Sequence, residues 1–134
     1  MFSNDSEIFV LARKCGLIPA DAKEGDFKET ELCQRLANFD AFPGKSRIVV
    51  CTCGSRETVA CETGKDPVSR PVIPIKKEEI VDTNGAGDSF AGGFLAWFTK
   101  GASLEKCIDA GSYAASANLK TRGCAVPSFK PAFE

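Results

Sequence analysis

The sequence predicts an α/β fold in which helices cover a small mixed or parallel sheet. Segments 5–15 and 27–38 carry apolar residues at the spacing of amphipathic helices. Segment 47–52 is short, rich in β-branched residues and apolar at successive positions, which is typical of a strand covered on both faces. Two further helical patterns begin after Gly85 and at Ser103.

The two helices of the first half each have one apolar face. On the first helix this face consists of Ile8, Leu11, Ala12 and Cys15. On the second helix it consists of Leu32, Cys33 and Leu36. Gly16 ends the first helix. Only a stub of strand at residues 1–3 precedes it, and a parallel strand needs neighbours, so the segment is expected to belong to a larger sheet.

The remaining strand signals of the first half are weaker. The strand at 47–52 ends at Gly54, and the weak alternation at 58–62 predicts an antiparallel strand. Segment 64–79 contains three prolines, each of which lacks the N–H that a sheet interior uses. At most an edge strand at 71–75 is therefore expected there.

An aromatic stripe marks the helix that begins after Gly85. Its members are assigned to the core: Phe90, Phe94, Trp97 and Phe98. The pair Gly92-Gly93 allows another element to pack close, and Lys100-Gly101 ends the helix. The final helix begins at Ser103 and ends near Arg122-Gly123.

The composition is that of one modest globular domain. The chain has 134 residues, of which 43% are hydrophobic and 26% charged, and its net charge is −1. This balance argues against nucleic acid as a partner, and no apolar run approaches the ~20 residues that cross a bilayer. The opening MFSNDSEIFV lacks the basic region and apolar core of a signal peptide. We therefore expect a cytoplasmic protein, with the nucleus as the alternative.

Seven cysteines are many for this length. They are Cys15, Cys33, Cys51, Cys53, Cys61, Cys107 and Cys124. The odd number and the lack of a CxxC pair disfavour a disulfide framework. Zinc is disfavoured too, because Cys51 and Cys53 are one residue apart and the sequence has no histidine. Buried, reduced thiols are the expectation.

The segment 82–88, Asp-Thr-Asn-Gly-Ala-Gly-Asp, carries the candidate chemistry. Gly85 and Gly87 let the backbone turn tightly and leave amide N–H groups without side-chain cover. Because the segment leads into a helix, these amides and the helix dipole favour an anion such as phosphate. Asp88, in the first turn, is placed to take a proton from a hydroxyl nucleophile. The alternative is an ordinary glycine turn with an acidic helix start.

Two other glycine motifs fail on spacing. A dinucleotide-binding GxGxxG needs a third glycine where Phe90 stands. The run Gly44-Lys45-Ser46 resembles the end of a P-loop, but Phe39 stands where an earlier glycine is required. That run also precedes a strand, whereas a P-loop precedes a helix.

The run DTNGAGDSFAGGF resembles the second signature of the ribokinase-like (PfkB) carbohydrate and nucleoside kinases. The fuller pattern, with AGSYAAS at 110–116 and TRGC at 121–124, is similar to the members that phosphorylate adenosine. Weaker matches extend over essentially the whole chain. The resemblance implies a ribokinase-like α/β fold, with this chain as the carboxy-terminal, ATP-binding portion of a helix-covered, mostly parallel sheet.

The resemblance implies ATP-dependent phosphorylation of adenosine at the ribose 5′-hydroxyl, which gives AMP in purine salvage. Asp88 is then the general base. Gly85, Ala86 and Gly87 form the anion hole around the transferring phosphoryl group. Phosphoryl transfer depends on alignment and charge neutralisation, which such a loop supplies.

The resemblance also implies cation sites. Asp82, with the backbone at Asn84, would shape a loop for a monovalent cation such as K⁺, beside residues 121–124. The alternative for Asp82 is a turn residue that binds its own backbone. Asn4 and Glu7 match a family pair that supports Mg²⁺ through water, and their spacing is equally that of a helix capping box.

Two further elements would contact ATP. Thr52 and Gly54, at the carboxyl end of a strand, match a family element that touches the ATP phosphates, and the alternative is an ordinary strand-ending turn. Small residues of the final helix would line the adenine pocket, and the alternative is close helix packing. These residues are Ala110, Ser112, Ala115 and Asn118.

The chain does not match the family's amino-terminal part, which holds the lid and most acceptor-binding residues. We expect the chain to need that half for activity, because half of the clamp that aligns the acceptor is absent. An unpaired sheet edge and an exposed apolar surface are expected as well. Two alternatives stay open: a kinase for a sugar such as ribose or fructose, and a catalytically inactive nucleotide-binding module.

Overall fold

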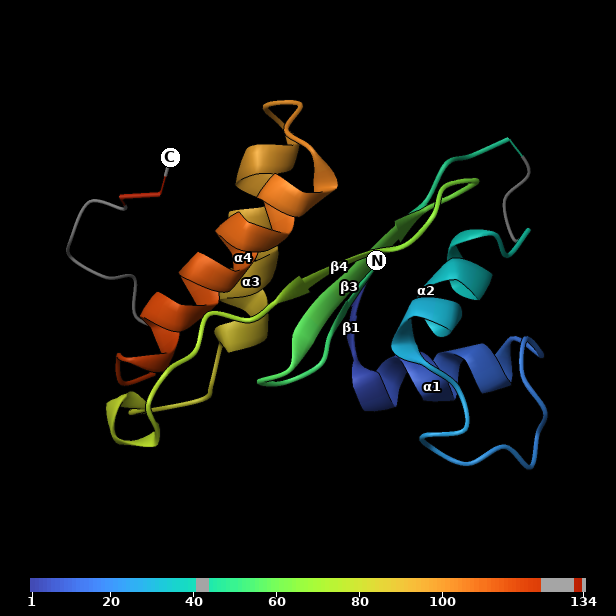
Figure 1. The fold of residues 1–134 in the computed structure, drawn as a ribbon, viewed down its shortest axis with the longest axis horizontal. Helices are drawn as coiled ribbons and strands as arrows, with labels where there is room; N and C mark the ends of the chain where they lie inside the picture. The colour runs from blue at the N-terminus through green and yellow to red at the C-terminus, as the bar shows by residue number, and fades with distance from the viewer. Residues whose placement is uncertain (41–43, 124–131, 134) are drawn as a thin grey trace. The chain divides into compact units, whose positions relative to one another are not determined.

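The computed structural model describes residues 1–40, 44–123 and 132–133. The chain forms two compact units, unit 1 (Met1–Pro71) and unit 2 (Val72–Glu134). Figure 1 shows their helices and strands in chain order by colour. Among the described residues, no helix is long and apolar enough to cross a membrane.

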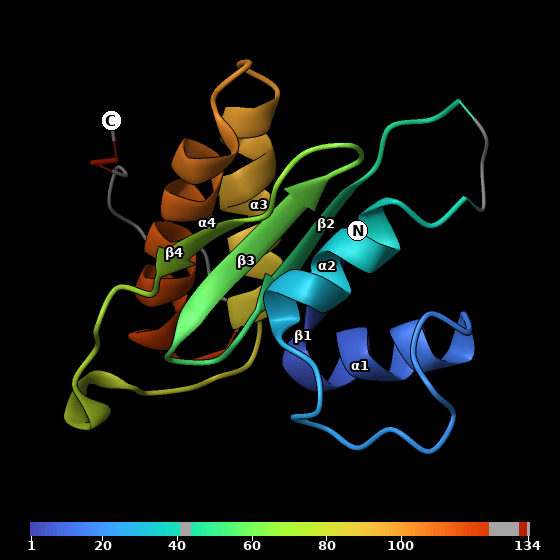
Figure 2. The ribbon, with the colours of Figure 1, turned by 45° about the vertical axis from the view of Figure 1, so that its right-hand side comes forward.

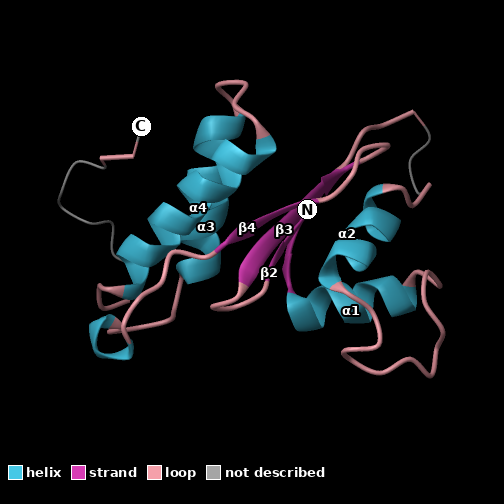
Figure 3. Cartoon of the chain, in the orientation of Figure 1, coloured by secondary structure: helices cyan, strands magenta, loops and turns pink. Residues whose placement is uncertain are grey.

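Unit 1 contains a four-stranded sheet with the order β1-β2-β3-β4 (Figure 3). The strands are β1 (Phe2–Asn4), β2 (Ile48–Thr52), β3 (Glu57–Glu62) and β4 (Val68–Pro71). β1 pairs parallel with β2, whereas β2–β3 and β3–β4 are antiparallel pairs. The α/β class and the antiparallel β3 are confirmed. The described sheet is mixed rather than mostly parallel, because short connections join β2 to β3 and β3 to β4, and only antiparallel strands can be joined so closely.

β4 corrects the edge strand that the sequence predicts at 71–75. Its pairing with β3 runs from Val68 opposite Ala60 to Pro71 opposite Glu57. The edge position is confirmed, since β4 ends the strand order. The strand ends at Pro71 rather than beginning there, because the residues before the proline keep the N–H groups that a ladder needs.

The two predicted helices of unit 1 are confirmed as α1 (Asp5–Lys14) and α2 (Glu29–Ala37). They contact each other and the sheet, as Figure 2 shows. The core between them includes Ile8, Leu32 and Val49. Val49 belongs to a run of three buried residues in the middle of β2, which confirms a strand covered on both faces.

One face of α1 differs from the prediction. Phe9 is only 5% exposed, whereas Leu11, which the apolar pattern places inside, is 37% exposed. Cys15 is only partly buried. The reason is that α1 packs against α2 and the loop before it as well as against the sheet. Phe9 lines a cavity there with Phe27 and Leu32, so the buried face of α1 is rotated towards Phe9.

Unit 2 consists of a short 3₁₀ helix, η1 (Lys77–Glu79), and two long helices, α3 (Ala86–Phe98) and α4 (Leu104–Leu119). The sequence does not predict η1. The two long helices pack side by side (Figure 1). The predicted start of α4 is confirmed, because the Ser103 side chain caps it by accepting a hydrogen bond from the Lys106 amide, at 3.3 Å.

Close packing of α3 and α4 depends on two glycines that face each other's helix. A Cβ added at Gly93 would lie 2.6 Å from the carbonyl oxygen of Ala110. A Cβ added at Gly111 would lie 2.8 Å from the Phe90 ring. The close packing predicted for Gly92-Gly93 is therefore confirmed for Gly93, whereas a Cβ at Gly92 would meet nothing within 4 Å.

The aromatic stripe of α3 is only partly core. Phe90 and Phe94 are 3% and 2% exposed, but Phe98 is 44% exposed and Trp97 is partly exposed. A helix turns by about 100° per residue, so residues four apart drift by about 40° at each step and Phe98 lies about 80° round from Phe90. The prediction that the whole stripe is core was wrong for its last turn.

Candidate functional site

The loop before α3 presents backbone amides at a helix amino terminus. Gly85 is the N-cap and has φ +77°, a left-handed conformation that glycine adopts without strain. Because Gly85 has no side chain, no side-chain hydrogen bond caps this helix end. The Ala86 amide donates to the Thr83 carbonyl oxygen at 3.4 Å. The amides that follow it in the first turn lack an intrahelical acceptor, as at any helix start, and the helix dipole favours an anion there.

Asp88 stands in the first turn of α3, as the sequence predicts. Gly87 and Asp88 are exposed, and Gly85 and Ala86 are partly exposed. An acidic side chain at this position is stabilised by the helix dipole. The loop therefore offers a solvent-accessible carboxylate beside the uncapped amides, which is the arrangement that proton removal from a bound hydroxyl next to a phosphate needs.

Asp82 fastens this loop to the end of α4. Its Oδ1 accepts a hydrogen bond from the Asn84 amide and its Oδ2 accepts one from the Gly123 amide, each at 2.9 Å. The Val81 amide also donates to the Leu119 carbonyl oxygen, at 2.8 Å. The bond to Asn84 confirms the turn interpretation of Asp82. The cation interpretation stays a prediction, and Cys124 of the partner segment lies outside the described residues.

The Asp82 carboxylate gives a pH dependence. The hydrogen bond from the Asn84 amide, followed by that from Gly123, lowers the pKa of Asp82 below its ordinary value of 3.8. A lowered pKa in the folded state means that the ionised form stabilises the loop, so this contribution is present above pH 3.8 and lost as the pH falls through the lower folded pKa. We expect the NMR amide signals of Asn84 and Gly123 to titrate together below that pH, and Asp82→Asn to abolish the titration. Amide signals that stay fixed in acid would contradict the fastening.

Asn4 and Thr52 lie opposite each other at the carboxyl ends of the parallel strands β1 and β2. Asn4 Oδ1 accepts from the Glu7 amide at 2.8 Å, and Glu7 Oε2 accepts from the Asn4 amide at 2.9 Å. This confirms the capping box. The carboxyl ends of parallel strands are where α/β proteins place ligands, so the register brings the predicted magnesium pair beside the predicted phosphate element.

The turn after β2 reverses the chain into β3. Gly54 has φ +60°, the Cys53 amide donates to the Glu57 carbonyl oxygen at 2.9 Å, and the Arg56 amide donates to the Cys53 carbonyl oxygen at 3.1 Å. Thr52 Oγ1 donates to the Ser3 carbonyl oxygen at 3.4 Å. The strand-ending turn is thus observed, and the phosphate contact of Thr52 and Gly54 stays a prediction.

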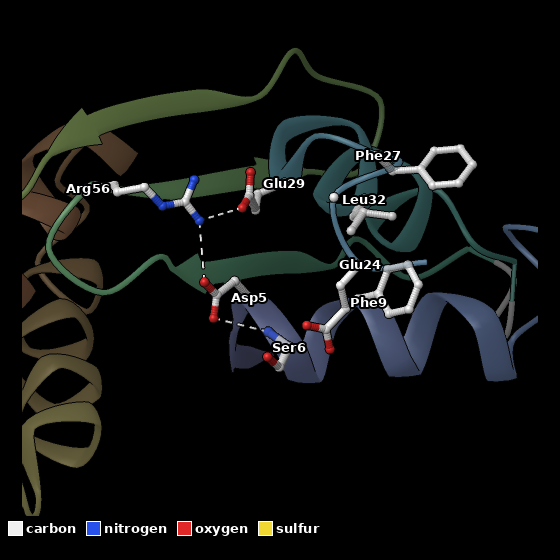
Figure 4. Close-up of a pocket in the computed structure, with 9 residues that line it drawn as sticks. Asp5, Ser6, Phe9, Glu24, Phe27, Glu29, Leu32 and Arg56 are labelled. Atoms are coloured by element: carbon white, nitrogen blue, oxygen red, sulfur yellow. Dashed lines mark hydrogen bonds and ion pairs between the residues drawn. The ribbon is translucent and has the colours of Figure 1, made fainter. Parts of the chain in front are cut away.

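Arg56 is a residue of this edge that the sequence analysis missed. Its Nη2 donates to Glu29 Oε1 at 2.6 Å and to Asp5 Oδ2 at 3.3 Å. The same residues border a cavity of about 290 Å³ whose apolar side includes Phe9 and Phe27 (Figure 4). No local pattern signals these bonds, because they join residues 27 and 51 positions apart in the sequence.

The residues assigned to adenine lie on α4 with different surroundings. Ala110 is buried, and its carbonyl oxygen faces Gly93, so the helix-packing interpretation is confirmed at this position. Ser112 and Asn118 are 6% and 3% exposed, and Ala115 is partly exposed. Asn118 Oδ1 is buried without a hydrogen-bond partner among the described residues. The adenine contact of all four residues stays a prediction.

The described cysteines are free, and all but Cys15 are buried. The neighbouring Cys33 thiol and burial raise the pKa of Cys51 to about 12. The Cys51 thiol and burial raise the pKa of Cys53 well above the ordinary thiol range. Within residues 1–40, 44–123 and 132–133, no group of three or more acidic, cysteine or histidine side chains could hold a metal ion. Cys51 and Cys53 are therefore protonated core residues at neutral pH.

The predicted site residues thus form two groups, one in each unit. Unit 1 brings together Asn4, Glu7 and Thr52 at one sheet edge, with Gly54 in the adjoining turn. In unit 2, Asp82 fastens the glycine loop at 82–88, which is predicted to bind an anion, to the residues that follow α4.

Comparison with known proteins places these features in a family. Residues 1–131 match the family described as pfkB family carbohydrate kinase. Adenosine kinase 2 of Arabidopsis thaliana is 36% identical over 133 residues, which are 99% of this chain and 36% of the relative. The chain therefore spans about a third of the length of such relatives.

Two solved structures support the same placement. Anopheles gambiae adenosine kinase, in complex with P1,P4-di(adenosine-5) tetraphosphate, is 34% identical with a TM-score of 0.77, covering 96% of this chain and 37% of that one. A probable sugar kinase from Rhizobium etli is 31% identical with a TM-score of 0.69, covering 92% of this chain and 31% of that one. A match over nearly all of its length, joined to the ribokinase-like fold, shows that the chain belongs to the pfkB family of carbohydrate kinases.

Proposed function

We propose that this chain supplies the ATP- and anion-binding part of a kinase that phosphorylates adenosine at the ribose 5′-hydroxyl, giving AMP. The observation that carries the proposal is the exposed Asp88 beside the uncapped amides of α3. The similarity to adenosine kinases from a plant and an insect supports adenosine as the acceptor.

In the proposed reaction, Asp88 and the backbone amides of the loop have different roles. Asp88 takes the proton of the 5′-hydroxyl, whose oxygen then forms a bond to the γ-phosphorus of ATP while the bond to the β–γ bridging oxygen breaks and ADP leaves. The amides around Gly85–Gly87 donate hydrogen bonds to the charged oxygens of the transferring group. Such a reaction asks the protein for positioning and charge stabilisation rather than covalent chemistry.

Magnesium and a monovalent cation would complete the charge balance. Asn4 and Glu7 fit a role through water, because both side chains are exposed and Glu7 Oε1 has no hydrogen-bond partner among the described residues. Asp82 fits a cation loop by its accessible carboxylate, which its amide donors hold in place. Bound Mg²⁺ would neutralise phosphate charge during transfer.

The proposed kinase needs a further part. The chain spans about 36% of the Arabidopsis relative. β1 ends the strand order of the described sheet, and apolar side chains are exposed on β1 and α1, namely Phe2, Val10 and Leu11. An added strand and its helices would cover such an edge. We propose that the acceptor-binding half docks there.

One experiment tests the function and its alternatives. The chain would be mixed with the amino-terminal two thirds of the Arabidopsis relative and incubated with ATP, Mg²⁺ and either adenosine, ribose or fructose. We expect AMP from the mixture and none from either part alone. A sugar phosphate instead of AMP would favour a sugar kinase. The similarity to the probable sugar kinase from Rhizobium etli supports this alternative. ATP binding without transfer to any acceptor would favour an inactive nucleotide-binding module.

A further inference from the structure

Arg56 stands where three segments of unit 1 meet. It follows the turn that carries Thr52 and Gly54, and its side chain reaches the first residue of α1, Asp5, and the first residue of α2, Glu29. Figure 4 shows the guanidinium between the two carboxylates. No other described side chain is shown to bridge these three segments.

The Asp5 side chain that Arg56 contacts is also held by a local hydrogen bond. Asp5 Oδ1 accepts a hydrogen bond from the Ser6 amide at 3.1 Å, which leaves Oδ2 for Arg56. Asp5 adjoins Asn4, the N-cap of α1, whose side chain is bound to the Glu7 amide. A contact that fixes the position of Asp5 therefore also restrains Asn4, the preceding residue and one member of the predicted magnesium pair.

The backbone of Arg56 is itself part of the turn after β2. Its amide closes the turn by donating to the Cys53 carbonyl oxygen at 3.1 Å. The Glu29 side chain is only 21% exposed, whereas the Arg56 side chain is 56% exposed, so the guanidinium is anchored on a partly buried carboxylate. The bond to Arg56 also lowers the pKa of Glu29, so Glu29 is ionised at neutral pH.

We infer that Arg56 is a positioning residue for the nucleotide site: through Asp5 and Glu29 it holds the Thr52–Gly54 turn in register with the Asn4/Glu7 cap. Its role in catalysis rests on the proposed function, whereas its mechanical role does not. The two predicted cofactor elements lie on different segments, and the backbone pairing of β1 with β2 stops at Asn4 and Thr52. The bonds of Arg56 join the turn after β2 to the starts of α1 and α2, beyond the last backbone pair of the two strands.

The first test needs no nucleotide. Hydrogen exchange of the whole chain would be followed at the amides of Glu7, Ser6 and Arg56, each of which donates a bond described above. In Arg56→Gln we expect all three to exchange faster together. The control is Arg35→Gln, because Arg35 also pairs at 2.6 Å with an exposed carboxylate, that of Glu31. Its second bond goes to the Leu17 carbonyl oxygen at 2.6 Å, so neither contact involves Asp5, Glu29 or the turn after β2. Unchanged exchange at Ser6 and Glu7 in Arg56→Gln would overturn the inference.

The second test uses the assembled kinase. We expect Arg56→Gln to raise the KM for MgATP by about tenfold with a smaller change in kcat, as loss of an outer positioning contact typically does. Glu29→Gln should have a smaller effect, because the bond from Arg56 to Asp5 remains. The double variant should exceed Arg56→Gln by little, because both substitutions remove the bond between Arg56 and Glu29. Arg56→Lys should restore most of the affinity, because both carboxylates contact the single atom Nη2. An equal change of KM in Arg35→Gln, or no change of KM in Arg56→Gln, would contradict the role of Arg56 in positioning the nucleotide site.

The two tests fail separately. If the wild-type assembly makes no product and binds no MgATP, the proposed function is wrong, and the exchange data still decide whether Arg56 couples the turn to the cap. If the wild type is active and Arg56→Gln behaves like the wild type in both tests, the proposed function stands and this inference falls.

Discussion

Replacing Asp88 with asparagine is expected to lower the rate of AMP formation by the assembled kinase about 10²–10⁴-fold, the usual worth of a positioned general base. Asparagine keeps the shape of the side chain but cannot take the hydroxyl proton at neutral pH. The exposed amides of the loop remain in place, because backbone bonds close the turn, from the Ala86 amide to the Thr83 carbonyl oxygen and from the Ser89 amide to the Gly85 carbonyl oxygen. Affinity for MgATP should therefore change much less than turnover.

The measurement is single-turnover AMP formation, with nucleotide affinity determined in parallel on the same protein. Asp21→Asn is the matched control, because Asp21 is an exposed aspartate of a loop in unit 1 that carries no predicted role. Full turnover in Asp88→Asn would remove this carboxylate from the mechanism, and equal losses in both variants would point to damage of the fold.

Adding one methyl group at Gly93 is expected to destabilise unit 2 by about 1–3 kcal/mol, the usual cost of overpacking. A Cβ at this position would lie 2.6 Å from the Ala110 carbonyl oxygen and 2.9 Å from the Ala114 Cβ. One of these atoms belongs to the backbone of α4 and cannot move aside alone. The two helices must separate along their contact.

Gly92→Ala provides the opposite expectation one residue away. A Cβ at Gly92 meets nothing within 4 Å, so the substitution should stabilise α3 by about 0.5–1 kcal/mol through helix propensity. Urea unfolding followed by the fluorescence of Trp97, the only tryptophan of the chain, reports on α3 for both variants. Stability changes of the same sign would show that helix propensity, rather than the contact with α4, decides the outcome.

The sequence predicts well what is encoded within a few residues. The glycine loop at 82–88 could be placed at the start of α3, because the glycines and Asp88 occupy a short run that leads directly into an apolar helical stripe. The capping box of Asn4 and Glu7 and the start of α4 at Ser103 are local in the same way, and both are confirmed. Each depends on hydrogen bonds between residues three apart.

The sequence predicts less well what depends on contacts between distant segments. The position of β4 follows from its register against β3, which the proline pattern alone does not fix. Phe98 and Leu11 are exposed because the partner surfaces available to their helices decide which apolar residues are buried. The bonds of Arg56 to Asp5 and Glu29 span most of unit 1, and no spacing rule indicates them.

The rate at which the buried cysteines are alkylated reports how often the structure around each of them opens. A thiol buried in a closed interior reacts slowly with iodoacetamide, because the reagent reaches it only when the surrounding structure opens. Cys33, Cys51, Cys53 and Cys61 sample unit 1, and Cys107 samples unit 2. Mass spectrometry of the modified peptides would thus rank the two units by kinetic accessibility, in one sample and without an engineered probe.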